Sequence, residues 1–597
     1  MPVRVSPRVL PAPAGPSRGA RELPAVLPAP PHTPVARART VYDRRTGRPP
    51  FARRWVLPAA LAVAAVHVVA NVISPFGVHR DELLYLAMGE HLRLWAMDFP
   101  PFIAVLAQVT RGLGGANAVV DGTAVLRLAP ALAHGALVVL AAVLARELGG
   151  RRGAQLLAAL CVGASPLFVS AGGLFQPVVF DQLWWTLGFA ALVRAGRVGW
   201  LHSRRRRRDR RDTRVDWAIL GAAVGFGLLT KFSVAFFAAG VLVGVLATPL
   251  RRTLRTPVPW AAAALALVLG APSVVGQARL GWPVAAQMAD LRAAQLARVG
   301  PLEFLGGQVL LAGPSLVLAL VGLAVLLGAG RRVARARPNW QWAASGDALV
   351  ASPGARAAGV AALVAVLLLL LARGKPYYAG PVYPLLWAAG AVALVGDRRA
   401  RTARRRMAVA GGAAVVYGAL TLPLALPLLR PATTARYAAA LGVAPRSNTG
   451  VALALPQDFA DMLGWPAQAG AAAAAWSTLA PEEQAEAAVI GGNYGQAGAL
   501  ALYGPRLGLP PAVSPAGSFW FFGPGEREGR VAVVVADSAA AAPALARLYA
   551  DVRPVGPAVS GPERAWLVPE ERRAWVFVAR GGRLLLRDAW SGLKGRQ

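Results

Sequence analysis

Apolar runs of membrane-spanning length recur along most of this chain of 597 residues, and they limit its fold more than any other feature. A helix needs roughly 20 mostly apolar residues to cross a bilayer. Hydrophobic residues make up 56% of the sequence and charged residues only 16%. A soluble protein could not keep that much apolar surface away from water. The sequence therefore predicts a polytopic α-helical membrane protein.

The apolar runs predict about eleven transmembrane spans, and the connections between them differ in charge. The spans lie near residues 55–75, 123–145, 154–172, 178–196, 215–231, 232–250, 258–277, 304–329, 355–373, 381–396 and 407–429. Alternate connections carry the arginine clusters Arg146–Arg152, Arg204–Arg208, Arg251–Arg255, Arg331–Arg337 and Arg398–Arg406. Because basic loops stay in the cytoplasm, we expect a multi-pass plasma-membrane protein with a cytoplasmic N-terminus.

Three regions follow from the composition. Residues 1–50 are rich in proline and arginine and predict a disordered cytoplasmic tail. Residues 51–430 hold all the predicted spans. Residues 431–597 are less apolar, with strand-like runs at Val531–Val535 and Trp575–Ala579 and an alanine-rich helical stretch near 538–549. This last region predicts a small α/β domain on the extracytoplasmic face.

Charge and cysteine content exclude several classes of function. The formal net charge is +35, but the basic residues gather between apolar segments. We interpret this charge as membrane topology, with anionic lipid as a contact of the basic tail, and we predict no nucleic-acid partner. Cys161 is the only cysteine, which excludes an internal disulfide framework and a cysteine-based zinc site.

Four acidic residues stand out on the predicted outer face. Asp81 and Glu82 are adjacent just after the first span, and Asp98 precedes a Pro-Pro pair and a short amphipathic segment. Asp181 lies inside the outer end of an apolar helix, where the bilayer penalises a charge. Acids at the membrane rim can abstract a proton or bind a cation. The alternatives are hydrated loop residues in the first loop and an arginine partner in the bundle for Asp181.

Cations reach the same face. Arg127 lies near the outer end of the second span, while Lys231 and Lys375 each follow a span. Only three of the 64 basic residues are lysines, and two of them lie at these outer helix ends, which favours a phosphate site over snorkelling to lipid headgroups. Tyr377 and Tyr378 are candidates for an interfacial belt, for stacking on a sugar, or for packing against a polyprenyl chain.

Taken together, these motifs resemble the dolichyl-phosphate-mannose protein mannosyltransferase superfamily, which is glycosyltransferase family 39 with its bacterial relatives. The resemblance rests on the Asp81-Glu82-Leu-Leu-Tyr85 and Asp98-Phe-Pro-Pro101 stretches and spans roughly residues 55–597. Further matches are Val125–Pro130, Asp181, Leu228–Ser233, Gly374–Pro381, Gly492–Ala499 and Tyr503–Pro510. Many relatives have Asp-His-Pro-Pro, so a role of that histidine would be lost or moved in this chain.

The resemblance implies a GT-C membrane fold and inverting transfer of a sugar from a polyprenyl-phosphate donor on the extracytoplasmic face. It implies that Asp81 is the catalytic base and that Glu82 assists it. It places Asp98 and Asp181 near donor and acceptor, with Tyr377 and Tyr378 in the same substrate-binding region. We expect Lys231, Lys375 and Arg127 to hold the donor phosphate.

Other interpretations stay open. A transporter or flippase of a lipid-linked sugar would use the same outer phosphate site, but it predicts polar residues through to the cytoplasmic side. A non-catalytic assembly protein would leave the acids at the membrane rim unexplained. The sequence names no sugar and no acceptor, which could be a protein, a lipid or a cell-wall glycan. Cofactors are unknown: a divalent metal is a candidate, but His79 and His91 match no metal-binding motif.

Overall fold

The structure is a computed structural model and describes residues 48–202, 213–328, 351–395 and 400–595. Its contacts divide the chain into Met1–Gly47 and Arg48–Gln597, and the description below concerns the second unit. The predicted disordered tail 1–50 lies outside the described residues except for its last three positions. The clusters Arg204–Arg208 and Arg331–Arg337 lie largely or wholly outside them as well.

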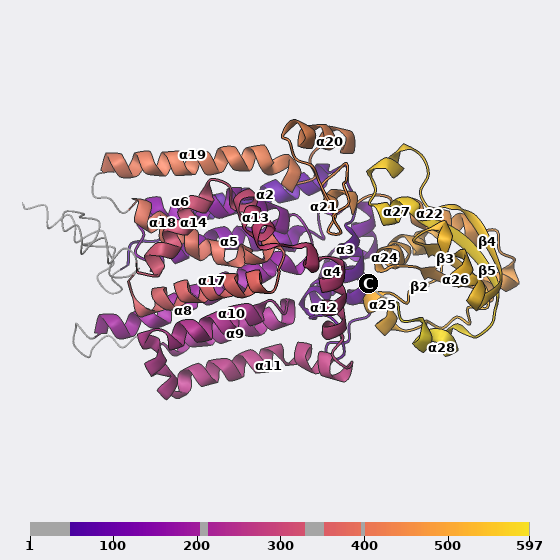
Figure 1. The fold of residues 1–597 in the computed structure, drawn as a ribbon, viewed down its shortest axis with the longest axis horizontal. Coiled ribbons are helices and arrows are strands. Elements are labelled where there is room, and N and C mark those ends of the chain that lie inside the picture. Colours follow the sequence, from indigo (N-terminus) through magenta and orange to yellow (C-terminus); the bar gives the residue numbers. More distant parts are fainter. Residues whose placement is uncertain (1–47, 203–212, 329–350, 396–399, 596–597) are drawn as a thin grey trace, which may run out of the picture. The chain divides into compact units, whose positions relative to one another are not determined.

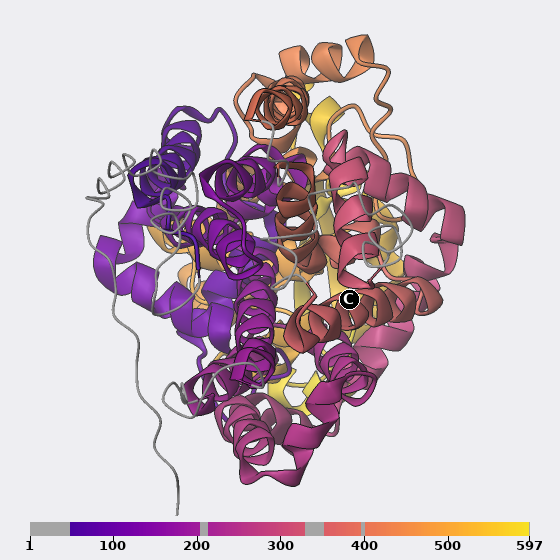
Figure 2. The same cartoon turned by 90° about the vertical axis from the view of Figure 1, so that its left-hand side faces the viewer.

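Helices make up the described chain as far as residue 425, and in Figure 1 they run side by side. Figure 2 shows the same helices from one end. They are α2 (Arg53–Ile73), α3 (Arg80–Glu90), α4 (Phe102–Asp121), α5 (Leu128–Glu147), α6 (Arg152–Ala164), α7 (Pro166–Gly172), α8 (Pro177–His202), α9 (Arg214–Thr230), α10 (Val234–Leu246), η1 (Pro249–Arg255), α11 (Pro257–Arg279), α12 (Pro283–Ala294), η2 (Leu296–Arg298), α13 (Pro301–Ala312), α14 (Ser315–Leu326), α17 (Pro353–Leu371), η4 (Pro376–Val382), α18 (Tyr383–Val395) and α19 (Ala400–Ala425).

Six of the described helices are long and apolar enough to cross a membrane, and up to nine are if each bent pair counts as one span. The chain is therefore a multi-pass membrane protein, while the number of eleven spans stays a prediction. Two runs expected as single spans are bent: α6 with α7 by 61°, and α13 with α14 by 110°. Helix α10 is bent by 99° from η1, most of which is the predicted loop cluster Arg251–Arg255. A proline follows each break, at 166, 249 and 314, where its ring and missing N–H interrupt the helix.

The C-terminal part contains a five-stranded sheet, as the sequence predicted. Its strands are β1 (Ala488–Gly491), β2 (Ala512–Val513), β3 (Ala532–Ala536), β4 (Tyr549–Pro557) and β5 (Trp575–Gly582), in the order β2-β1-β3-β5-β4. Strand β1 is parallel to β2 and β3, whereas β5 is antiparallel to β3 and β4. Its helices are α20 (Pro431–Ala440), α21 (Gln457–Ala460), α22 (Trp465–Trp476), α23 (Pro481–Glu486), α24 (Tyr494–Tyr503), α25 (Gly517–Phe522), α26 (Ala542–Leu548), α27 (Pro569–Arg573) and α28 (Leu586–Ala589).

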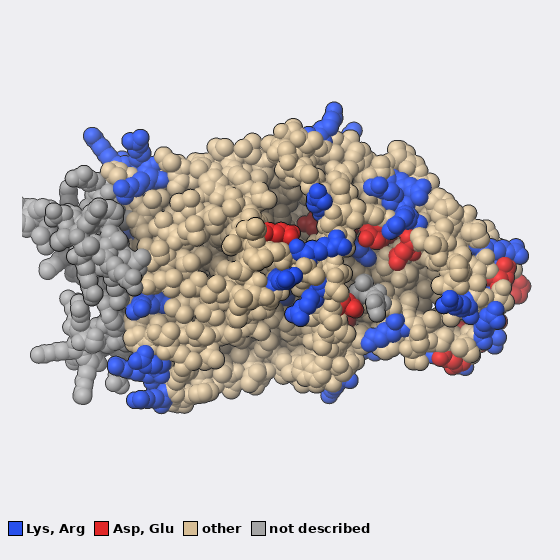
Figure 3. Space-filling view, in the orientation of Figure 1, with Lys and Arg blue, Asp and Glu red and all other residues tan. Residues whose placement is uncertain are grey.

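Charge is distributed unevenly along the helical part (Figure 3). Lysine and arginine side chains gather at one end, a nearly uncharged band covers the middle, and charged groups of both signs return next to the C-terminal part. Exposed apolar residues such as Leu61, Val268 and Leu320 belong to the helices of that band. An uncharged belt between two charged ends is typical of a bundle that crosses a bilayer.

Candidate functional site at the outer ends of the helices

The candidate base Asp81 is positioned by the first turn of α3. His79 is the N-cap: its backbone N–H donates to Glu82 Oε2 (2.8 Å), and its Nδ1 accepts from the Asp81 N–H (3.0 Å). Acidic residues in a first turn also interact favourably with the helix dipole. The cap formed by His79 therefore fixes the directions of both acids. Glu82 is turned into the protein, and Asp81 is turned away from it.

Glu82 is the acid that is turned inward. Arg127 donates to its Oε1 from Nε (2.8 Å) and to its Oε2 from Nη2 (2.7 Å), and neither side chain is exposed. The Phe175 N–H donates a further bond to Oε1 (2.7 Å). Burial opposes ionisation of this carboxyl, but Arg127 holds the pKa of Glu82 below its usual value. Glu82 thus ties together α3, the segment before α5 and the segment before α8.

This pairing gives Arg127 a role that differs from the expected phosphate ligand. Arg127 precedes α5 rather than lying within a span, and its guanidinium also donates to Asn71 Oδ1 (3.0 Å) and to the Gly77 carbonyl (3.0 Å). A phosphate group could reach this buried side chain only by displacing Glu82. The geometry therefore favours a structural ion pair at this position.

Asp81 is half-buried, with each carboxylate oxygen near one donor. The Tyr494 hydroxyl donates to Oδ1 (3.0 Å), and the Gln176 amide donates to Oδ2 over a longer distance (3.3 Å). Tyr494 is the first residue of α24 and thus comes from the C-terminal part of the chain. Asp81 also interacts electrostatically with Lys375. This carboxylate is the acid of the first loop that a substrate can approach.

Two lysines lie at the ends of other helices near Asp81. Lys231 follows α9, and its Nζ lies 4.4 Å from the ring centre of Tyr378 and 5.3 Å from that of Tyr377. Lys375 follows α17. Burial lowers the pKa of Lys375, and nearby Lys231 lowers it further. Within the described parts of the chain, neither ammonium group has a hydrogen bond or an ion pair, so both are available to an anionic ligand.

Asp181 is buried near Lys231 rather than among solvent-exposed groups. The Trp185 indole donates to its Oδ1 (2.9 Å), and the Ser233 hydroxyl donates to its Oδ2 (2.8 Å). Lys231 interacts electrostatically with the same carboxyl. Asp181 therefore holds together the outer ends of α8, α9 and α10 near the lysine that it helps to place.

Asp98 contacts the C-terminal part of the chain. The Ser518 hydroxyl, on α25, donates to its Oδ2 (2.7 Å), and Gln277 on α11 donates to its backbone carbonyl (2.5 Å). Burial raises the pKa of Asp98, and the bond from Ser518 lowers it in part. In this structure Asp98 links the end of the first outer loop to α11 and α25.

Sequence reasoning missed three groups at the site: Tyr494, Gln176 and Arg80. Tyr494 lies in the stretch Gly492–Ala499, which the resemblance included, but it received no role there. Arg80 lies over the Tyr494 ring at 4.4 Å and interacts electrostatically with Asp461 and Asp81. Burial raises the pKa of Asp461 to about 6, against the opposing effect of His79.

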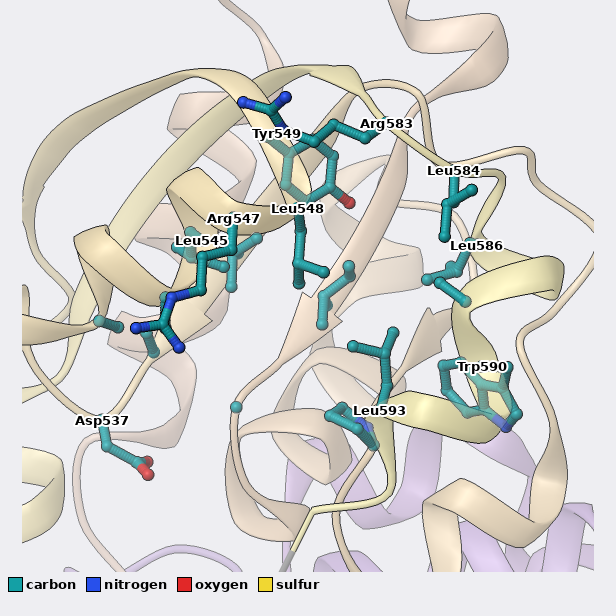
Figure 4. Close-up of a pocket in the computed structure, with 18 of the residues that line it drawn as sticks. Asp537, Leu545, Arg547, Leu548, Tyr549, Arg583, Leu584, Leu586, Trp590 and Leu593 are labelled. Atoms are coloured by element: carbon teal, nitrogen blue, oxygen red, sulfur yellow. The ribbon is translucent and has the colours of Figure 1, made fainter.

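The described residues offer no clear metal site. His79 Nε2 lies 3.9 Å from both Asp458 and Asp461, but no group of three or more histidine, cysteine or acidic side chains in the described ranges is arranged so that it could hold a metal ion. A separate cavity of about 430 Å³ lies in the C-terminal part, at the carboxyl ends of β1 and β3 (Figure 4). Leu548, Leu593 and Trp590 line it, and it is distinct from the Asp81 site.

Comparison with known proteins supports the fold. Residues 98–275 match the family model described as dolichyl-phosphate-mannose-protein mannosyltransferase. The chain also resembles the crystal structure of ArnT from Cupriavidus metallidurans bound to undecaprenyl phosphate, with a TM-score of 0.53 and 17% identity over 88% of this chain and 98% of that one. The crystal structure of ArnT from Cupriavidus metallidurans in the apo state gives a TM-score of 0.54 and 17% identity, and the match covers 92% of this chain and 100% of that one. No curated protein sequence matches the chain significantly.

The chain resembles this mannosyltransferase family over residues 98–275 and shares the fold of ArnT. The resemblance predicted from the sequence is confirmed over that segment, which begins after Asp81 and Glu82. The family match begins at Asp98 and includes Arg127, Asp181 and Lys231. The likeness to ArnT covers 88% to 92% of this chain and shows a shared fold.

Proposed function

We propose that this GT-C protein is a glycosyltransferase that moves a sugar from a polyprenyl-phosphate donor to an acceptor on the extracytoplasmic face. One observation carries the proposal: the half-buried carboxylate of Asp81 lies within electrostatic reach of Lys375, and neither Lys375 nor Lys231 forms a hydrogen bond or a close ion pair among the described residues. A base beside cations that form no close ion pair suits a reaction in which a nucleophile is deprotonated and an anionic group departs.

The donor phosphate binds between Lys231 and Lys375 in this proposal. Lysine ammonium groups act as point charges on phosphate, and partial burial strengthens that attraction. The rings of Tyr377 and Tyr378 confine Lys231 to one side. The GT-C neighbour ArnT binds undecaprenyl phosphate, which supports a polyprenyl phosphate here. The lipid chain would run along the uncharged band of the bundle.

The chemical step is then a single displacement. Asp81 takes the proton of an acceptor hydroxyl or amine as that atom attacks the anomeric carbon. The bond from this carbon to the phosphate oxygen breaks, and its electron pair leaves with the polyprenyl phosphate. Lys231 and Lys375 stabilise the negative charge that grows on that oxygen. Attack opposite the departing phosphate inverts the anomeric configuration.

The proposed orientation follows from the charges at the two ends of the bundle. Helices α6 and α19 begin at the basic end, within the predicted cytoplasmic arginine clusters Arg146–Arg152 and Arg398–Arg406. The Asp81 site and the C-terminal sheet lie at the other end. The positive-inside rule then places the N-terminus in the cytoplasm and the site outside.

Replacing Lys375 tests the phosphate site through pH. Its lowered pKa means that the ammonium form is lost at a lower pH than in an ordinary lysine, whose pKa is about 10.4. We expect kcat/KM for the donor to fall as pH rises through that lowered pKa. Lys375→Arg keeps the charge and moves this fall to higher pH, whereas Lys375→Ala lowers kcat/KM by about 10- to 100-fold at neutral pH. Donor kinetics across the alkaline range measure both effects, and a Lys375→Ala enzyme with unchanged kcat/KM would exclude a phosphate contact.

The function itself is tested with purified protein in lipid. Radiolabelled polyprenyl-phosphate mannose, glucose and arabinose are offered with a membrane and cell-wall extract as the source of acceptor. Label that moves from the lipid to another molecule establishes the transferase and names the sugar. Label that crosses the bilayer while still attached to polyprenyl phosphate identifies a flippase instead.

A further inference from the structure

We propose that the C-terminal part of the chain completes the catalytic centre, with Tyr494 as a positioning residue for Asp81. This inference rests on the proposed role of Asp81 as the base. Tyr494 and Asp81 are 413 positions apart in the sequence, yet the tyrosine hydroxyl lies 3.0 Å from Asp81 Oδ1. The C-terminal part would then be needed for the chemical step itself, beyond any part it takes in choosing an acceptor.

The hydrogen bond from Tyr494 distinguishes the two carboxylate oxygens. A carboxylate has no donor of its own, so the tyrosine hydroxyl must donate, and Oδ1 is committed to it. Among the residues that the structure describes, Oδ2 has only the longer contact with the Gln176 amide, at 3.3 Å. An acceptor hydroxyl or amine can displace this weaker contact and donate its proton to Oδ2. Tyr494 thereby sets the rotation of the carboxylate and selects the oxygen that acts as base.

The aromatic ring of Tyr494 also contacts helix α3. The Arg80 guanidinium carbon lies 4.4 Å from the ring centre, within range of a cation–π contact. Arg80 directly precedes Asp81 on α3, and it interacts electrostatically with Glu571 of the C-terminal part. Ring and hydroxyl therefore contact two successive residues of the helix that carries the base.

Polar contacts fix the beginning of α24, where Tyr494 is the first residue. Asn493 is the N-cap, and its Oδ1 accepts from the N–H groups of Gly495 (2.9 Å) and Gln496 (3.0 Å). Its amide nitrogen donates to Asp537 (2.7 Å) and to Glu571 (3.0 Å). The cap thus links α24 to the end of β3 and to α27, so that the position of Tyr494 depends on the folded C-terminal part.

Small residues bring α24 and α3 into close contact. A Cβ atom added at Gly498 would lie 2.7 Å from Leu83 Cβ and 3.1 Å from the Leu83 carbonyl carbon. One added at Gly495 would lie 2.9 Å from Arg80 Cγ. Because backbone atoms cannot move aside as a flexible side chain does, a larger residue at Gly498 must shift α24 relative to α3.

The first test is Tyr494→Phe in the full-length protein. Phenylalanine keeps a ring against Arg80 and removes only the hydroxyl. We expect kcat to fall by about 10- to 100-fold, the effect of losing one hydrogen bond to a charged group. The donor KM stays as in wild type, because Tyr494 has no hydrogen bond or ring contact with Lys231 or Lys375 among the described residues. The thermal unfolding midpoint changes little, because the ring keeps its contact with Arg80. A raised donor KM with unchanged kcat would overturn the inference in favour of a substrate contact.

A second test moves the helix and leaves the tyrosine in place. Gly498→Ala should lower kcat, and adding Tyr494→Phe to it should lower kcat little further, since the hydroxyl is already displaced. Gly470→Ala on α22 is the matched control, because a Cβ there meets nothing within 4 Å. Fully additive losses would overturn the inference. An inactive Asp81→Asn variant together with a Tyr494→Phe variant that matches wild type would contradict only the role of Tyr494. An active Asp81→Asn variant would contradict the proposed function itself.

Discussion

Asp81→Asn abolishes sugar transfer, with kcat lower by about 100- to 10,000-fold, the range expected when a general base is removed. Asparagine keeps an oxygen that can accept from the Tyr494 hydroxyl, so the fold and the contact with α24 are retained. It cannot take a proton from the acceptor. Initial rates of label transfer with saturating donor measure the loss, and an unchanged thermal unfolding midpoint shows that the variant is folded.

Asp458→Asn is the matched control for this result. Asp458 also interacts electrostatically with Lys375, but its side chain is 57% exposed. Removing its charge changes the same electrostatic environment without removing the base, so transfer should stay within a few-fold of wild type. Equal losses in both variants would mean that negative charge near Lys375, rather than proton transfer at Asp81, is what the reaction needs.

Arg127→Met destabilises the protein by about 3–5 kcal/mol, the usual cost of leaving a buried charge without its partner. Methionine fills part of the space, but Glu82 loses the two bonds at 2.8 and 2.7 Å and keeps only backbone donors from His79 and Phe175. The midpoint of denaturant or thermal unfolding in detergent should fall accordingly. Activity is lost with the fold rather than through weaker donor binding.

Arg111→Ala provides the comparison on the same face. Arg111 pairs with Glu90, and both side chains are about one-third exposed. An exposed pair is worth about 0–1 kcal/mol, so this variant should unfold close to wild type. If Arg127→Met unfolded like wild type and instead raised the donor KM, Arg127 would be a phosphate ligand, as the sequence analysis expected.

Local patterns in the sequence predicted most of the architecture. Apolar periodicity and arginine clusters predicted a membrane bundle, and the valine-rich run at 531–535 matches β3 while Trp575–Ala579 begins β5. The proline-dependent bends were not predicted, because a run such as 304–329 has uniform hydropathy on both sides of Gly313-Pro314. Hydropathy indicates which segments can lie in lipid. The bend depends on the local residues Gly313 and Pro314, which barely change the mean hydropathy of the run.

The candidate site was predicted in part. Adjacent acids in the first outer loop and the rarity of lysine drew attention to Asp81, Lys231 and Lys375, and the structure brings Asp81 and Lys375 within electrostatic range. The resemblance assigned the base to Asp81 and an assisting role to Glu82, but the local sequence could not show that Glu82 is buried in an ion pair, because its partner Arg127 is 45 residues further along the chain. The contact of Tyr494 with Asp81 depends on tertiary packing of α24 against α3, which no local pattern encodes.

The central claim is sugar transfer that releases polyprenyl phosphate, and a single-turnover experiment measures it directly. Proteoliposomes with excess enzyme receive donor labelled in both sugar and lipid, and one sample is assayed for both labels over time. We predict that one free polyprenyl phosphate appears for each sugar on the acceptor, at equal rates, and that Asp81→Asn produces neither. Intact donor that moves between the leaflets without release of polyprenyl phosphate would contradict the account.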